Sequence, residues 1–346
     1  MKRIKTGFLF MALFFGLTGC QMEQSAAPQS TQTGTVYQIR QQPFDLGEAV
    51  SLFLGKTMEE TKKKGAEIEK DHYHYEDEEQ SLSGGAFSDG TGFFLQYCDY
   101  TDNAGMAYYW ASDCYEHKND FADWGIRKAY PEDELTACSK EEALRYCRPY
   151  AEFMGYKEAE VTVCAMTQEM LEDVRKNFSA GAPVRGAKKA TDADDEIANA
   201  SVAWTKEDEA YYIIYKPYLG GKLMESVSQI LEIIYVPKYK KIMYACGKIP
   251  WLADQKAGEE TILSSEAAVE KVKQLHGVQN EQEIKIEKTS LVYSLNWDFA
   301  KEKKASLCWR VDYELKNSAQ YKGNQAFRAK LVDAVTGEFC TNFKED

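Results

Sequence analysis

The stretch Asp71–Glu79, which reads DHYHYEDEE, holds side chains suited to binding a metal ion. Alternate residues of a β-strand share one face, so a strand here would place His72, His74 and Glu76 together. Two imidazoles and a carboxylate are ligands that zinc and other divalent ions accept. The competing interpretation, which we favour, is a solvated edge strand with interleaved tyrosines that binds nothing. These three residues are therefore only weak candidates for metal ligands.

Motifs of the common hydrolases are missing from the sequence. It contains no G-x-S-x-G, no H-E-x-x-H, no S-x-x-K and no glycine-rich phosphate loop. A cysteine nucleophile needs a positioned histidine, and Cys114 with His117 is the only pair that lies close in sequence. Carboxylates abound in an acidic chain, so they identify no glycosidase pair. We expect no catalytic residue, no cofactor and no enzymatic activity, and an envelope hydrolase is the least favoured alternative.

Nine cysteines are present, and eight of them follow Cys20. Their spacing includes no C-x-x-C, which argues against a thioredoxin-like or zinc-ribbon site. Cys138 and Cys147 flank most of a predicted helix, and a rise of about 1.5 Å per residue separates them by ~13 Å, beyond the ~7 Å limit for a disulfide. Cys98 and Cys114 lie on the arms of a predicted hairpin and are better placed for a bridge. Most of these cysteines are expected to be small buried apolar side chains.

The N-terminus has the pattern of an export signal. Three basic residues precede the uncharged apolar run Gly7–Leu17, which has about half the ~20 residues that a membrane-spanning helix needs. The run ends in LTGC, and the small residues before Cys20 resemble the lipobox of bacterial lipoproteins. The resemblance implies a signal peptide over residues 1–19 and a diacylglyceryl group on the Cys20 thiol. Two acyl chains such as palmitate would anchor the protein stably, since each buried methylene contributes ~0.8 kcal/mol.

The mature chain is therefore expected in the cell envelope, lipid-anchored at the extracytoplasmic face of the cell membrane. Residues 20–35 are polar, small and low in complexity, which is typical of a flexible tether. The formal net charge is −13, and loss of the three basic signal residues makes it −16. Nucleic-acid binding needs a basic surface that displaces counterions, so we expect no nucleic-acid partner.

Two α+β units, each with helices on an antiparallel sheet, are expected after the tether. The first covers residues 36–178 and the second 202–346, and the aperiodic stretch 179–201 is read as a loop or linker. Helices of the first unit are predicted at LGEAVSLFLG, at the capped segment from Ser139 to Gly155, and at TQEMLEDVRKNF. Its strands are predicted at GTGFFLQYCDY and MAYYWASDCY, which would form a hairpin, and at AEVTVCAM.

The second unit is predicted to contain mostly strands around one capped helix. The helix is LSSEAAVEKVKQLHG, with Ala268, Val272 and Leu275 on one stripe and Gly277 as its stop. Strands are predicted at EAYYIIYKPY, a hairpin ILEIIYV-PKYK-KIMYACG, IKIEKTSLVYSLN, ASLCWRVDYELKN, QAFRAKLVDA and EFCTNF. Between the last two, VDAVTG should form a turn, in which Asp333 bonds turn amides and a glycine supplies a positive φ.

The C-terminal quarter, Glu259–Phe343, resembles a PepSY-type module, in the manner of lipoprotein relatives of the YycH/YycI regulators. The residues that carry the resemblance are a Trp-containing strand and a following Asp-Ala-x-Thr-Gly-Glu end, namely Trp309, Asp333, Ala334, Thr336, Gly337 and Glu338. Cys308 stands before the tryptophan where the pattern commonly has proline. The whole chain also resembles uncharacterised lipoproteins of anaerobic gut Gram-positive bacteria. The resemblance implies a PepSY-like C-terminal unit without catalytic residues that restrains peptidases or modulates membrane sensors.

The expected function is thus a non-catalytic protein-binding or regulatory module with a protein partner in the envelope. The alternative is a lipoprotein that binds cell-wall glycans or small solutes, because twenty-two tyrosines and six tryptophans offer faces on which sugars or prolines stack. A groove or an exposed sheet edge would favour partner binding, whereas a deep pocket with convergent polar groups would favour an enzyme or a solute binder.

Overall fold

The computed structural model describes residues 32–69, 72–86, 93–101, 105, 107–109, 111–112, 134–177, 203–225, 230–278, 283–295, 303–315 and 326–340. The expected signal peptide with Cys20, most of the tether, and the stretch 179–201 lie outside these ranges, as do Cys114 and His117. Within the described ranges, no helix is both long and apolar enough to span a lipid bilayer.

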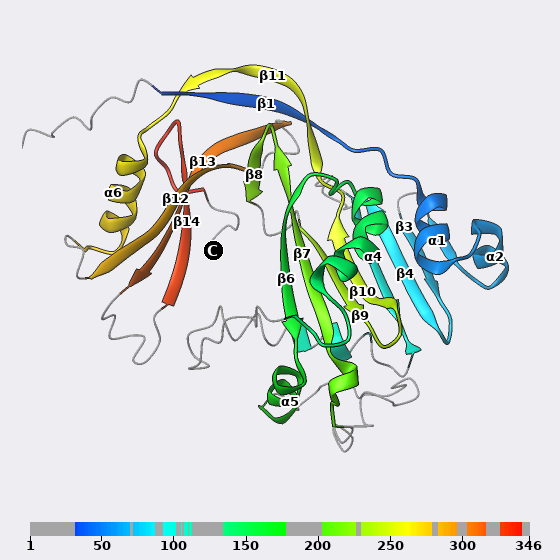
Figure 1. Ribbon diagram of the computed structural model, residues 1–346. Coiled ribbons are helices and arrows are strands. Elements are labelled where there is room, and N and C mark those ends of the chain that lie inside the picture. The colour runs from blue at the N-terminus through cyan, green and yellow to red at the C-terminus, as the bar shows by residue number, and fades with distance from the viewer. Residues whose placement is uncertain are drawn as a thin grey trace, which may run out of the picture.

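Strands dominate the described structure (Figure 1). The helices are α1 (Leu46–Leu54), α2 (Met58–Lys63), α4 (Lys140–Phe153), α5 (Gln168–Asn177) and α6 (Ser265–Leu275). The strands are β1 (Thr33–Gln41), β2 (Glu67–Glu69), β3 (His72–Glu76), β4 (Gln80–Ala86), β5 (Phe93–Asp99), β6 (Ala159–Met166), β7 (Ala210–Leu219), β8 (Lys222–Glu225), β9 (Leu231–Val236), β10 (Lys241–Lys248), β11 (Trp251–Thr261), β12 (Ile284–Ser294), β13 (Lys304–Leu315) and β14 (Ala326–Asp333).

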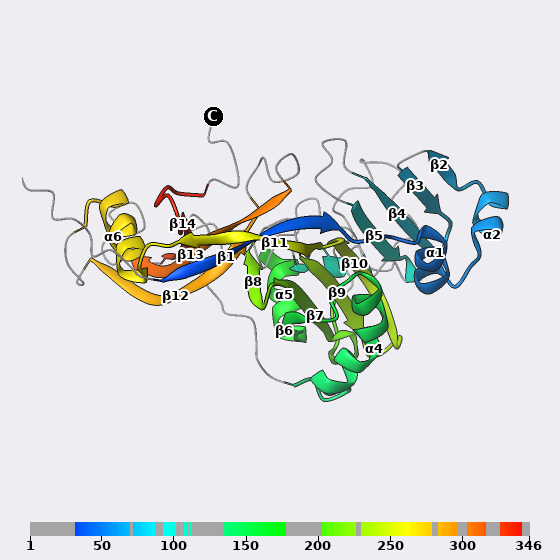
Figure 2. The same cartoon turned by 90° about the horizontal axis from the view of Figure 1, so that it is seen from above.

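Fourteen strands of the described ranges join in one mixed sheet. Its order is β11-β1-β13-β12-β8-β7-β9-β10-β5-β4-β3-β2, with β14 added beside β13 and β6 beside β7. The pair β8–β12 is parallel, and the other pairs described are antiparallel. Figures 1 and 2 show β1 and β11 running together from α6 at one end toward α1 at the other.

The expectation of an α+β fold with two separate helix-on-antiparallel-sheet units is wrong, because the described strands join in one sheet, while the PepSY-like character of the second unit stays a prediction. β1 comes from the start of the chain but pairs with β11 and β13, deep in the expected second unit. β6 pairs with β7 across the stretch 179–201, so hydrogen bonds of one sheet cross the expected boundary between 36–178 and 202–346. β1 and β11 escaped prediction because neither alternates apolar and polar residues, and most of β11 is exposed.

Three apolar cores lie against this sheet. α1 and α4 cover one face of β3, β4, β5, β7, β9 and β10, and α5 covers part of the opposite face. Successive residues of a strand point to opposite faces, and β7 shows this, since Tyr211 and Ile213 enter the first core while Tyr212 enters the second. The third core lies at the other end, where α6 packs with β12, β13 and β14. The first core bears the groove described below.

The expected strand at MAYYWASDCY is also wrong in the part that the structure describes, whereas Cys114 lies outside the described residues and its place beside Cys98 stays a prediction. The described residues 107–109 and 111–112 are helical. Tyr108 and Ala111 are buried and three residues apart, a helical spacing that the run of aromatic residues hid. This segment packs on the same core as Cys98.

The other predicted elements are mostly confirmed, with smaller differences. β1 begins at Thr33, inside the expected tether of residues 20–35. Leu275 of α6 is 48% exposed and so does not belong to the buried stripe. EFCTNF contributes only an isolated bridge between Val332 and Phe339 within the described residues. The turn before it is confirmed, since Gly337 has a φ of 73°.

Candidate functional site

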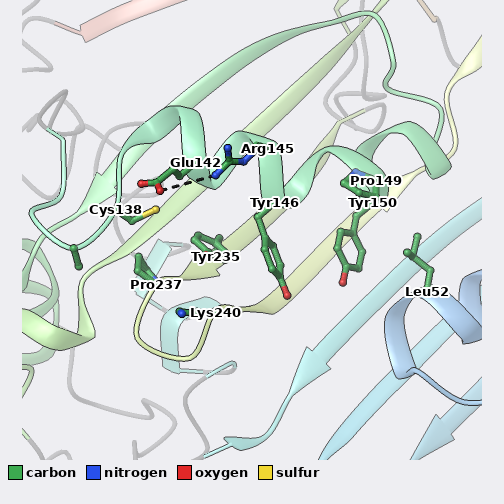
Figure 3. A pocket seen from close by; sticks show the side chains of 11 residues that line it. Leu52, Cys138, Glu142, Arg145, Tyr146, Pro149, Tyr150, Tyr235, Pro237 and Lys240 are labelled. Carbon is green, nitrogen blue, oxygen red and sulfur yellow. Dashed lines mark ion pairs between the residues drawn. The ribbon is translucent and has the colours of Figure 1, made fainter.

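An open groove lies on the face of the sheet that α1 and α4 cover (Figure 3). Its volume is about 590 Å³, within the ~300–1,000 Å³ typical of ligand pockets. α4 and the β9–β10 turn supply its two walls, and α1 contributes at one end. It is lined by Leu52, Ala137, Cys138, Glu142, Arg145, Tyr146, Pro149, Tyr150, Tyr235, Pro237 and Lys240. We call this feature the tyrosine groove.

The capped helix α4 determines which side chains face the groove. The Glu142 N–H donates to Ser139 Oγ at 3.2 Å, and the Ser139 N–H donates to the Glu142 carboxylate at 3.1 Å. This reciprocal capping box fixes where the helix starts. Small side chains form the buried stripe of the helix, namely Ala143, Cys147 and Ala151. Residues four apart share a helix face, so Tyr146 and Tyr150 form a second stripe, which lines the groove.

Three tyrosines form a continuous aromatic surface. The rings of Tyr146 and Tyr150 are stacked with centroids 6.4 Å apart, and the ring of Tyr146 lies 4.8 Å from that of Tyr235 on β9. Tyr146 is 37% exposed, whereas Tyr235 is buried. Aromatic pairs at such distances stabilise one another by ~0.5–1.5 kcal/mol beyond the area they bury. The surface is therefore rigid on the inside and open to a ligand along Tyr146.

Charged side chains stand along the two walls. Arg145 on α4 is largely exposed, with its guanidinium 3.9 Å from the Glu142 carboxylate. The opposite wall carries Lys240, which is exposed and has a φ of 51° at the β9–β10 turn. The chain as a whole is strongly acidic. Because these two cations stand at the groove, it attracts a carboxylate locally.

A smaller cavity of about 200 Å³ adjoins the groove and shares Tyr146 and Tyr150 with it. Its polar end is built around Asp99, which is buried. Asp99 accepts hydrogen bonds from the Thr101 N–H at 2.8 Å and from Tyr97 Oη at 3.4 Å, and the Lys241 ammonium lies 3.3 Å away. This carboxylate is thus engaged with the protein itself.

Burial keeps the tyrosines and the cysteine of the groove in their neutral forms. It raises the pKa of Tyr150 and that of Tyr235 each to about 12, with smaller contributions from neighbouring ionisable groups. Burial, helped by the nearby Glu142 carboxylate, also raises the pKa of the Cys138 thiol. At neutral pH the tyrosines are phenols that stack and hydrogen-bond, and Cys138 is a poor nucleophile because the thiolate is the reactive form.

The arrangement suits binding better than catalysis. No histidine is present among the described residues that line the groove. Glu142 is committed to the helix cap, where hydrogen bonds from Ser139 lower its pKa. General acid–base catalysis needs a group of matched pKa that is free to reach substrate, and neither Glu142 nor Cys138 meets that need.

The metal-ligand candidates lie on β3, far along the sheet from α6. His72, His74 and Glu76 share one face of the strand, as expected, while Tyr73 and Tyr75 are buried on the other. His74 Nδ1 is 2.8 Å from the Ser83 hydroxyl, and its Nε2 is 3.7 Å from the Glu76 carboxylate. Both ring nitrogens of His74 therefore have protein neighbours, and metal binding here stays the less favoured alternative, which the structure does not test.

The described cysteines after Cys20 are mostly buried, which confirms their expected role as apolar side chains. Cys98, Cys138, Cys147, Cys164 and Cys308 are buried, and Cys246 and Cys340 are partly exposed.

Sequence reasoning missed the tyrosine groove. Tyr146 and Tyr150 were treated only as parts of a capped helix, and Tyr235 only as part of a hairpin. A signal was present, since two tyrosines four apart lie off the stripe of small residues on the same helix. Large aromatic residues that lie beside the buried stripe of an amphipathic helix are not covered by the core under that stripe. A ligand or another element can cover them instead.

Comparison with known proteins concerns the fold alone. No protein-family model and no curated protein sequence matches the chain. Among solved structures, an uncharacterised protein from Eubacterium rectale ATCC 33656 is similar, with a TM-score of 0.50 and 13% sequence identity. The alignment covers 89% of this chain and 86% of that one. The sheet architecture described here therefore also occurs in a crystal structure.

Proposed function

We propose that the protein is a lipid-anchored lipoprotein on the extracytoplasmic face of the membrane that binds a partner protein without catalysing a reaction. The tyrosine groove is the proposed binding site, and the single observation that carries the proposal is its surface of Tyr146, Tyr150 and Tyr235 between exposed cations. The N-terminal pattern ending at Cys20 supports the anchor, and the PepSY-type resemblance of Glu259–Phe343 supports a non-catalytic role.

The occupant that fits best is an extended segment of the partner, containing proline or aromatic residues and at least one carboxylate. Extended proline-containing segments dock on aromatic-lined grooves at low entropic cost because their conformation is preformed. Tyr146 and Tyr150 provide two stacking positions on one wall, with Tyr235 between the walls. Arg145 and Lys240 are placed to meet an acidic residue of the segment, and phenolic hydroxyls can bond its backbone.

Cell-wall glycan is the second candidate, and the same aromatic surface favours it. Sugars stack on tyrosine faces, but a neutral glycan would bring no negative charge to the exposed Lys240 ammonium. The charge of the groove therefore favours a protein segment.

In-cell photocrosslinking tests the proposal. A photoreactive phenylalanine analogue replaces Tyr146 in one variant and Tyr218 in a control, since these side chains are similarly exposed at 37% and 40%. We expect one discrete protein adduct from position 146 in intact cells and none from position 218. If Tyr150→Ala, combined with the photoreactive residue at position 146, abolishes the adduct, the partner binds in the groove.

Two results would overturn the proposal. Adducts of equal yield from both positions would indicate a non-specific surface. Adducts that contain glycan and no protein, and that disappear after digestion of the cell wall, would assign the groove to the second candidate.

A further inference from the structure

Two cysteines from distant parts of the chain meet beside the C-terminal turn. Cys308 lies on β13 and Cys340 follows the turn after β14, and their Sγ atoms are 2.8 Å apart. Cys308 is fully buried, whereas Cys340 is partly exposed. No atom of another residue fits between two sulfurs at this distance, so the thiols are in direct contact.

The C-terminal turn is built so as to bring Cys340 to this position. Asp333 Oδ1 accepts hydrogen bonds from the Val335 and Thr336 N–H groups at 2.9 and 2.8 Å. The Gly337 N–H donates to the Asp333 carbonyl at 2.9 Å, with Gly337 in a left-handed conformation. These bonds reverse the chain within a few residues.

Beyond the turn, backbone hydrogen bonds hold the returning segment on the sheet. The Asp333 N–H donates to the Glu338 carbonyl at 2.7 Å, and the Cys340 N–H donates to the Leu331 carbonyl at 2.9 Å. Asp333 is the register partner of Cys308 across β13 and β14. Both thiols are therefore fixed by backbone pairing, and neither depends on a flexible side chain to reach the other.

We propose that Cys308 and Cys340 are joined by a disulfide in the mature protein. Neither cysteine lines the tyrosine groove, so the inference is independent of the proposed binding site and rests only on the proposed extracytoplasmic location. A protein outside the cytoplasm meets conditions in which disulfides form and persist. The bond would tie the end of the chain to β13 and close a loop of 32 residues.

Thiol–disulfide exchange with an oxidised dithiol protein or oxidised glutathione supplies the chemistry. The Cys340 thiolate, being the accessible one, attacks a sulfur of the oxidant's disulfide, forming a mixed disulfide and releasing one oxidant thiol. The Cys308 thiolate then attacks the Cys340 sulfur and releases the second oxidant thiol. Two protein thiols thereby lose two protons and two electrons, and the oxidant's disulfide is reduced. The hydrogen bond with Cys340 and burial raise the pKa of Cys308, so the second step depends on the proximity of the two sulfurs, which compensates for a small thiolate fraction.

A metal ion is the other chemistry these atoms suggest. One oxygen of Asp333 lies with both sulfurs in a group whose atoms are all within 4.8 Å of one another. Zinc–sulfur bonds of ~2.3 Å in a tetrahedral site hold two thiolates ~3.8 Å apart, which is wider than the contact seen. Oδ1 of Asp333 already accepts two hydrogen bonds of the turn. The geometry therefore favours the disulfide.

Peptide mapping of the full-length mature protein tests the bond. Trypsin cuts after Lys304, Arg310, Lys330 and Lys344, so it leaves each cysteine alone in its peptide, ASLCWR and LVDAVTGEFCTNFK. We expect these two peptides to be recovered as one linked species without reductant and as separate alkylated peptides with it. Reduction should also lower Tm by about 5–10 °C. Cys246→Ser should keep the linked species, and the Tm of the Cys308→Ser/Cys340→Ser variant should not respond to reductant.

Two results would contradict the proposed disulfide. Recovery of both peptides with alkylated thiols, after the purified protein has been incubated with oxidised glutathione, would overturn the proposal. So would stoichiometric zinc, retained after dialysis against zinc ions and lost in the double variant, because the pair would then be a metal site. Since purified reduced protein serves as its own reference, the test does not depend on the variant folding well.

Discussion

The ring of Tyr146 on α4 lies 4.8 Å from that of Tyr235 on β9, so the helix and the sheet meet through two aromatic side chains at the mouth of the tyrosine groove. Tyr235 is buried and serves the core, while Tyr146 keeps a free face. Replacement of Tyr146 and Tyr150 by alanine should therefore abolish partner capture, and it should cost ~2–5 kcal/mol of stability because Tyr150 also packs against Phe53. Crosslinking yield and thermal unfolding check the two parts. Tyr218→Ala is the control, and unaltered capture by the double variant would contradict the prediction.

Acid should destabilise the protein partly through Asp77. Burial raises the pKa of this carboxyl, but hydrogen bonds from Tyr75, Glu79 and Gln80 and the Lys56 ammonium lower it from 3.8 to about 2. Because the folded-state pKa is the lower one, the stabilisation is complete above pH 3.8 and is lost as the pH falls toward 2. Asp77→Asn should cost about 1–2 kcal/mol at neutral pH, and its deficit relative to the wild type should shrink across that acid range.

Urea unfolding at a series of pH values measures this difference. Asp254→Asn is the matched control, because Asp254 pairs with Arg40 at an exposed site, where such pairs contribute ~0–1 kcal/mol. A deficit of Asp77→Asn that stays constant from neutral pH to below pH 2 would show that the carboxylate charge is not responsible.

Gly105 should tolerate no side chain. A Cβ there would lie 2.3 Å from the Asp99 carbonyl and 2.5 Å from the Met243 carbonyl, and both are backbone atoms that cannot move aside cheaply. We expect Gly105→Ala to destabilise the protein by ~2–3 kcal/mol, as overpacking of a core does. Gly258→Ala on the exposed strand β11 meets nothing within 4 Å and should be neutral. Chemical denaturation measures the free energy of unfolding of both variants. Equal stabilities of Gly105→Ala and Gly258→Ala would contradict the packing described.

Cys20 should carry the only attachment to the membrane. Cys20→Ala is expected to abolish incorporation of labelled fatty acid and to move the protein out of the membrane fraction, because a chain without acyl groups loses ~0.8 kcal/mol per buried methylene. Fractionation and labelling of intact cells measure both effects, with Cys246→Ala as a control that keeps its label. A labelled, membrane-bound Cys20→Ala variant would refute lipidation at this residue.

Local signals in the sequence predicted local structure well. The Ser139–Glu142 capping box, the Ser264 cap and the turn at Gly337 are all present, because each depends on residues three or four apart. The hairpin β9–β10 was predicted for the same reason, since its strands adjoin in sequence.

Features that depend on distant partners were not predicted. β1 is a strand because β11 and β13 supply its hydrogen bonds, and its first three residues, Thr33 to Thr35, were assigned to the tether. The single sheet could not be inferred, because the bonds that join its parts link residues far apart in the chain. The tyrosine groove escaped for the same reason, since Tyr146 and Tyr235 meet only once the helix has docked.

The placement of β1 has a consequence for how the chain acquires its fold. Thr33 is synthesised early, yet its register partner is Thr261, and Tyr37 pairs with Ala305. Neither half of the polypeptide can complete its own hydrogen bonding until the other has been made, and such long-range pairing slows folding. The first strand of a nascent chain would therefore remain unpaired until most of the chain has been synthesised, whereas β2 to β5 can pair with one another much earlier.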